Sequence, residues 1–196
     1  MERTTRQYRA QSKPFTTRED NGEKRIEGYF AVFDGEYQLF DGATESVDSH
    51  AFDGQLNGDV RCLIDHDTRL VIGRTTAGTL TLRTDEHGLW GSVLINPDDT
   101  DAMNLYARVQ RGDVNQCSFG FDILDEEFED RGGGNVHWTI KQVKLYEVSC
   151  VTFPAYESTS IAARKDDLAN IRQRKTEAWK NAMKERINRW HSDSSS

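Results

Sequence analysis

The segment Asp65-His66-Asp67 places a histidine between two carboxylates. It follows a short run in which Val60, Cys62 and Ile64 alternate with less apolar residues, and this alternation predicts a strand that delivers His66 at its C-terminal end. A histidine in that place could be a general base, a metal ligand or an ordinary surface residue. The remaining four histidines lie in polar or glycine-rich surroundings that indicate solvated side chains.

Ser118 lies in a second segment with strand-like alternation. It shares one face with Gly120, whereas Cys117, Phe119 and Phe121 lie on the other face. A glycine beside the serine leaves room for a substrate backbone, although a bulge of small residues would give the same pattern. The segment lacks the G-x-S-x-G turn of the α/β-hydrolases.

Glu147 interrupts an apolar strand face that includes Val143, Leu145 and Val151. Burying a carboxylate alone costs roughly several kcal/mol, so this side chain needs a partner. A histidine is a natural partner, and an acid that orients a histidine is the third member of a serine-protease triad. The alternatives are that this face is exposed or that Glu147 pairs with an arginine such as Arg74.

The elements around these residues are mostly strands. We predict strands at 26–33, at 78–84 and 89–95 (a hairpin with a turn at 85–88), at 116–124 and at 136–153, with an acidic, glycine-rich excursion at 125–135. Helical spacing predicts a helix over 101–111, with an N-cap within 98–100 and a stop at Gly112, and a second helix from 160 onward. This order predicts an α+β fold: a closed or strongly curved, mostly antiparallel β-barrel with flanking helices and a C-terminal amphipathic helix.

Charge divides the chain into three parts. Residues 1–25 carry a net charge of +3, residues 26–161 one of −15 and residues 162–196 one of +4. We therefore predict an N-terminal arm or edge strand at 1–25, one main domain at 26–164 and a basic amphipathic helical tail at 165–196. The acidic body argues against nucleic-acid binding. No apolar run suits a membrane or a signal peptide, and three dispersed cysteines support neither disulfides nor zinc.

Four segments together resemble the caudovirus prohead protease family, whose fold is similar to that of the herpesvirus assembly proteases. They cover about residues 26–164 in the family's order, and they are 26–33, 64–67 with 72–80, 111–121 and 145–156. The resemblance implies a serine endopeptidase in which Ser118 is the nucleophile, His66 the base and Glu147 the orienting acid. Herpesvirus relatives use a second histidine as third member, so His137 is a rival for Glu147.

The resemblance also implies the surroundings of the reaction. Ala155 and Tyr156, in a loop after the third member, and Gly120 become candidates for binding the oxyanion or the substrate. The expected partners are the major capsid protein, its scaffold segment and the chain itself, by self-processing or as a homodimer. The expected place is the assembling prohead in the host cytoplasm, with no cofactor, metal, nucleic acid or membrane.

Two other classes of function compete with this interpretation. A non-enzymatic capsid scaffolding or assembly factor would use the tail, which either targets partners or packs on the acidic body, and would need no catalytic residues. A metal-dependent hydrolase would use Asp65, His66 and Asp67, but consecutive strand residues point to alternate faces and converge poorly on one ion.

Overall fold

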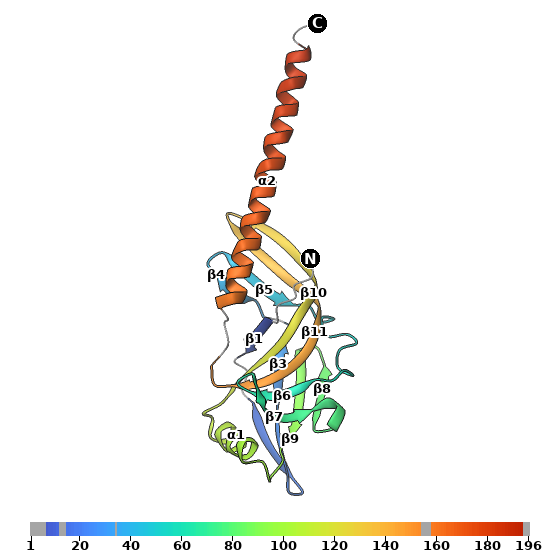
Figure 1. Ribbon diagram of the computed structural model, residues 1–196, viewed down its shortest axis with the longest axis vertical. Helices are drawn as coiled ribbons and strands as arrows, with labels where there is room; N and C mark the ends of the chain where they lie inside the picture. Colours follow the sequence, from blue (N-terminus) through green and yellow to red (C-terminus); the bar gives the residue numbers. More distant parts are fainter. Residues whose placement is uncertain (1–6, 12–14, 34, 154–157, 194–196) are drawn as a thin grey trace. The chain divides into compact units, whose positions relative to one another are not determined.

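The computed structural model describes residues 7–11, 15–33, 35–153 and 158–193 (Figure 1). The chain divides into two compact units, residues 1–157 and 158–196, which are described separately below. Both sheets and the short helix α1 belong to the first unit, and the long helix α2 forms the second.

The first sheet is built on one long antiparallel hairpin, visible in Figure 1 as a pair of curved ribbons. The two strands of the hairpin are β10 (Gln116–Gly132) and β11 (Asn135–Val151). On its free side, β10 pairs antiparallel with β1 (Gln7–Gln11). The free side of β11 pairs with two parallel strands in succession, β5 (Ala43–Val47) and then β6 (Arg61–Ile64). Each has an antiparallel neighbour, β4 (Tyr37–Phe40) beside β5 and β7 (Asp67–Arg74) beside β6.

The second sheet is antiparallel and has four strands in the order β2 (Thr16–Asp20), β3 (Glu23–Val32), β9 (Gly88–Leu94) and β8 (Leu80–Thr84). A 3-10 turn, η1 (Thr75–Ala77), links β7 to β8. The region expected to be an arm or one edge strand thus contributes β1 to one sheet and β2 to the other.

The α+β class is confirmed, but the predicted closed barrel is wrong. Within the described residues the strands form two open sheets, and the first is mixed because β11 accepts parallel strands along its free side. Strand periodicity reveals which face is buried, whereas it does not reveal the direction or the identity of a neighbouring strand. That is why the pattern could not distinguish two open sheets from a barrel.

The core lies under the apolar faces that the sequence predicts. Cys117, Phe119 and Phe121 of β10 are all buried, and the Phe119 ring packs on Phe52 and on Phe121. The same apolar cluster includes Leu105 of α1. Residues 118 and 120 consequently lie on the face of β10 away from this core.

Two local predictions are confirmed and one is wrong. Helix α1 (Thr100–Arg111) begins at the N-cap Asp99 and ends at Gly112, whose φ of 89° is left-handed. The β8–β9 hairpin is also present. The excursion expected at 125–135 is instead a continuation of β10 as far as Gly132, because residues 125–132 pair with β11 through several register shifts.

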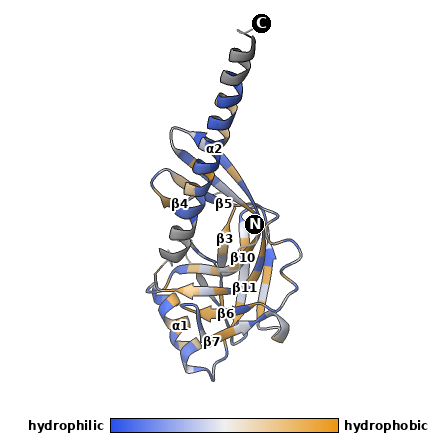
Figure 2. Ribbon diagram, turned by 45° about the horizontal axis from the view of Figure 1, so that its top comes forward, coloured by the Kyte–Doolittle hydropathy of each residue, from blue (hydrophilic) through white to orange (hydrophobic). Residues whose placement is uncertain are grey.

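Helix α2 (Ser158–Asp193) confirms the helix expected from residue 160. In its described part, Trp179 is 62 % exposed and Met183 is 37 % exposed. Figure 2 shows this helix mainly in the colours of hydrophilic residues. Its use as a targeting element stays a prediction. Neither α1 nor the described part of α2 combines the length and apolar character that a membrane-spanning helix needs.

Candidate active site

His66 occupies the second position of a tight turn between β6 and β7. Ile64 pairs with Asp67 across the turn, so the loop has two residues, and both have left-handed backbones, with φ of 49° at Asp65 and 61° at His66. Positive φ at both positions defines a type I′ hairpin turn, which favours Asn-Gly. A histidine there costs about 1–2 kcal/mol relative to an ordinary backbone, and such strain clusters at functional residues.

Asp65 ties this turn to the end of β11. Its carboxylate accepts hydrogen bonds from the backbone N–H of Thr152 (2.7 Å) and from Thr152 Oγ1 (3.1 Å). Its own N–H donates to the carbonyl of Cys150 (2.9 Å). The carboxylate of Asp65 therefore holds the turn at the end of β11, whereas the partner of His66 is Glu147, described below.

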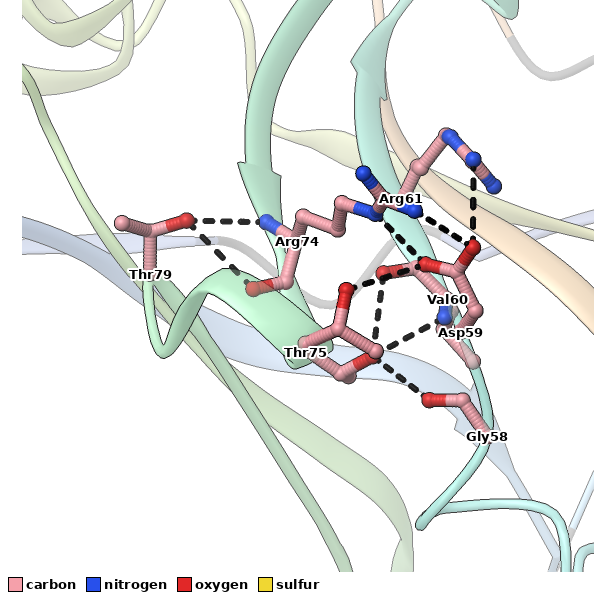
Figure 3. A network of polar contacts seen from close by, with 8 residues as sticks. Gly58, Asp59, Val60, Arg61, Arg74, Thr75 and Thr79 are labelled. Atoms are coloured by element: carbon pink, nitrogen blue, oxygen red, sulfur yellow. Dashed lines mark hydrogen bonds and ion pairs between the residues drawn. The ribbon is translucent and has the colours of Figure 1, made fainter.

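The other end of the β6–β7 hairpin is held by Asp59 (Figure 3). Arg74 donates from Nε (2.6 Å) and Nη2 (2.7 Å) to the Asp59 carboxylate, and Arg61 adds a bond of 3.2 Å. Hydrogen bonding from Arg74 lowers the pKa of Asp59 from 3.8 to about 2. Arg74, the alternative partner considered for Glu147, is thus engaged with Asp59.

Glu147 lies near the C-terminal end of β11 and only 3 % of it is exposed. One carboxylate oxygen, Oε1, is 2.7 Å from His66 Nδ1, and the other, Oε2, accepts a hydrogen bond of 2.6 Å from Ser149 Oγ. An ionised carboxylate only accepts, so the proton of the neutral imidazole lies on Nδ1. This tautomer leaves Nε2 with a lone pair that can accept a proton.

Gly120 pairs directly with Glu147 across the hairpin. A Cβ atom on Gly120 would lie 2.3 Å from Glu147 Oε1 and 3.0 Å from Tyr8 Cε1. The room expected above this glycine is filled in the structure by the carboxylate and the tyrosine. Gly120 therefore permits the approach of Glu147 to β10, and its role toward substrate stays a prediction.

Ser118 pairs directly with Ser149 and is fully buried. Its Oγ and His66 Nε2 are both buried atoms without a hydrogen-bond partner in the described part of the protein. A buried polar atom left without a partner costs about 1–3 kcal/mol. The two atoms that a proton transfer would use are thus free of competing bonds, and catalytic hydrogen bonds often form only with substrate present.

Strand β1 borders this part of the site and contributes Tyr8 to it. Ala10 pairs with Ser118, and the Tyr8 ring lies 4.3 Å from the His66 ring at an interplanar angle of 61°. Arg9, on the opposite face of β1, forms a buried ion pair with Glu45 of β5 that includes an Nη2–Oε2 contact of 3.0 Å. The strand is therefore also anchored by an ion pair on the face away from the site.

His137, the rival third member, lies elsewhere. Its ring nitrogens contact Thr44 Oγ1 (2.7 Å) and Ser46 Oγ (2.9 Å), both on β5. Burial lowers the pKa of His137 below its ordinary value. His137 and Glu147 are separated by roughly 30 Å along β11 at about 3.3 Å per residue, so the structure brings Glu147 to His66 and leaves His137 at the far end of the strand.

The residues considered for a metal site diverge. The carboxylate of Asp65 bonds with Thr152, that of Asp67 bonds with Arg69, and His66 faces Glu147. Among the described residues there is no group of three or more potential ligands that could hold an ion. Cys62, Cys117 and Cys150 are buried and these three form no disulfide, and burial raises the pKa of Cys62. Ala155 and Tyr156 lie outside the described residues.

Residues 13–174 match the family described as caudovirus prohead serine protease. The chain belongs to this family. It is 29 % identical over 153 residues to the prohead protease of Enterobacteria phage HK97, an alignment that covers 75 % of this chain and 64 % of that protein. The chain thus spans about two thirds of the length of this family relative. The fold is similar to that of the bacteriophage T4 capsid assembly protease, with a TM-score of 0.50 at 11 % identity over 76 % of this chain and 98 % of the other.

Sequence reasoning missed two residues of the candidate site. Ser149 was not singled out from the sequence, although residues two apart on a strand share a face, and this spacing could have identified it as a partner of Glu147. Tyr8 had no usable signal, because its place depends on the pairing of β1 with β10.

Proposed function

We propose that the chain is a serine endopeptidase of phage prohead maturation, with Ser118 as nucleophile, His66 as base and Glu147 as orienting acid. The observation that carries the proposal is the contact of 2.7 Å between His66 Nδ1 and Glu147 Oε1, on the strand whose Ser149 pairs directly with Ser118. Family membership supports the same chemistry.

The proposed reaction is acyl transfer. Ser118 Oγ attacks the peptide carbonyl carbon while His66 Nε2 takes the hydroxyl proton, and Glu147 stabilises the resulting imidazolium. The same nitrogen then protonates the leaving amine, which leaves an ester on Ser118. Water hydrolyses that ester by the reverse proton path. Backbone donors must stabilise the oxyanion, and Ala155 and Tyr156 remain our candidates for that place, with Gly120 as a candidate for contact with the substrate.

The proposed substrates are the capsid protein and its scaffold segment, together with this chain itself, inside the assembling prohead. The HK97 relative is a prohead protease and the T4 neighbour a capsid assembly protease, which supports this assignment. Ser118 is fully buried, so some of the residues that bury it must move before a peptide reaches the nucleophile.

The test compares the wild-type chain with Ser118→Ala and with Ser92→Ala. Ser92 is another buried serine, and its Oγ donates to Glu27 in the second sheet (2.9 Å), so it controls for the loss of a buried hydroxyl. Each variant is co-expressed with the capsid protein of the same phage, and the capsid termini are read by mass spectrometry. A fluorophosphonate probe is added to the purified chains.

We expect capsid cleavage and probe labelling in the wild type and in Ser92→Ala, and neither in Ser118→Ala. Normal cleavage by a folded Ser118→Ala chain would refute the catalytic assignment. A wild-type chain that neither cleaves nor becomes labelled would instead favour a non-enzymatic assembly factor.

A further inference from the structure

We propose that Ser149 is a positioning residue for catalysis, which holds the carboxylate of Glu147 in the orientation that His66 requires. This inference rests on the function proposed above. Ser149 is fully buried, and its Oγ donates to Glu147 Oε2 over 2.6 Å while the other oxygen, Oε1, faces His66. Each carboxylate oxygen therefore has its own partner.

The need for such a partner follows from the length of the glutamate side chain. Three torsions separate its carboxylate from the backbone, and a single contact with the histidine would leave rotation about the last of them weakly restrained. Ser149 follows two residues later on β11, so its side chain lies on the same face as Glu147. A hydrogen bond to Oε2 then fixes the carboxylate plane and aims Oε1 at Nδ1.

The surroundings of Glu147 fix the direction of its hydrogen bond with Ser149. Glu147 packs against Gly120 of β10, where a Cβ atom would approach Oε1 to 2.3 Å. An ionised carboxylate can only accept, so the hydroxyl proton of Ser149 is directed at Oε2. The carboxylate is consequently located by a close backbone approach on one side and a donor on the other, both from a rigid hairpin.

The same observation distinguishes the roles of the two serines, which pair directly across the hairpin. The proton of Ser149 is committed to the carboxylate, whereas Ser118 Oγ has no partner among the described residues. Ser118 is thus the hydroxyl that is free to react, and Ser149 acts only through Glu147.

The experiment measures fluorophosphonate inactivation and capsid-protein cleavage for Ser149→Ala, Ser149→Thr and Ser92→Ala in the full chain. Ser149→Ala removes one oxygen and should fold. Misplacing a catalytic group by about 1 Å costs about 10²-fold in rate, so we expect the maximal inactivation rate and kcat to fall about 10- to 100-fold. We expect KM and the probe's binding constant to change little, because Ser149 does not touch substrate.

Two controls separate positioning from stability. Ser92→Ala loses an equivalent serine-to-glutamate bond in the second sheet and should keep wild-type rates. Ser149→Thr keeps the hydroxyl on a strand-compatible side chain and should recover most of the loss. In a Glu147→Ala background, Ser149→Ala should cause no further loss, because residues that act through one another are non-additive.

Mass spectrometry of the probe adduct distinguishes failure of the inference from failure of the proposed function. Wild-type labelling at Ser118 together with an unimpaired Ser149→Ala variant would overturn the inference alone. An equal loss in the wild-type and Glu147→Ala backgrounds would also overturn it. An adduct on Ser149, or an unlabelled wild-type chain, would overturn the proposed function and the inference together.

Discussion

A histidine lies near each end of β11, His137 on the strand itself and His66 on the β6–β7 turn, and the two differ in how many of their ring nitrogens have a partner. At the far end, both ring nitrogens of His137 have hydroxyl partners on β5. At the near end, His66 has one nitrogen on Glu147, whereas the other is buried without a partner. His66 also lies in a left-handed turn with φ of 61°. A satisfied histidine indicates a structural role, whereas a strained and half-satisfied one indicates chemistry.

The largest expected effect separates these two histidines. His66→Ala should lower capsid cleavage by at least about 10⁴-fold, as the loss of a base does in other serine proteases. His137→Ala should keep the activity and lower the free energy of unfolding by about 1–3 kcal/mol, since it removes two part-buried hydrogen bonds of about 0.5–1.5 kcal/mol each. Urea unfolding and cleavage assays measure the two effects. An inactive His137→Ala variant together with a fully active Glu147→Gln variant would assign the role of third triad member to His137 instead of Glu147.

The second prediction compares two glycines that have no room for a Cβ atom, Gly120 at the candidate site and Gly28 in the second sheet. Gly120→Ala should displace the Glu147 carboxylate and lower kcat by about 10²-fold. Gly28→Ala is the matched control, because its Cβ atom would meet Phe15 Cδ1 at 2.5 Å in the other sheet. We expect Gly28→Ala to lower stability and leave kcat unchanged. Equal kcat values for the two variants would show that the approach at Gly120 does not matter.

The third prediction isolates backbone strain at the turn. His66→Gly and His66→Ala both lose the bond to Glu147, but only glycine accepts a φ of 61° without a Cβ clash. The glycine variant should therefore be more stable than the alanine variant by about 1–2 kcal/mol. Urea unfolding at neutral pH measures the difference, and equal stabilities would contradict the strained turn.

The smallest expected effect concerns acid stability at the base of the same hairpin. The pKa of Asp59 is lowered from 3.8 to about 2 in the folded chain. Its contribution to stability is therefore present above about pH 4 and is lost as the pH falls toward 2. Asp59→Asn should therefore make the free energy of unfolding less dependent on pH in that interval. Urea titrations at successive pH values measure this dependence. An unchanged pH dependence would show that the bond to Arg74 adds nothing.

Local features were predictable because they depend on neighbours in the sequence. The caps of α1 at Asp99 and Gly112 and the delivery of His66 directly after a strand follow from short-range patterns. The apolar face that surrounds Glu147 implied a buried carboxylate in need of a partner, and the structure supplies His66.

Features set by distant pairing were not predictable. The parallel pairing of β11 with β6 places Glu147 opposite Arg61 in the strand register, and no sequence periodicity predicts this pairing. The extension of β10 to Gly132 depends on β11 as well, because the acidic residues there are polar enough to read as a loop. The left-handed backbone of His66 was missed because Asp-His lacks the glycine that usually identifies a type I′ turn in a sequence.

The parallel pairing of β6 with β11 also determines when the turn that carries His66 can reach its place during synthesis of the chain. Residues 61–64 are made long before residues 147–150, so the histidine turn has no strand to dock on until the whole β10–β11 hairpin has been synthesised. Contacts so distant in sequence close late in folding. On a ribosome-bound chain, the proposed base His66 therefore cannot meet its proposed partner Glu147, and the proposed site cannot act on neighbouring proteins, until residues 147–150 have been made.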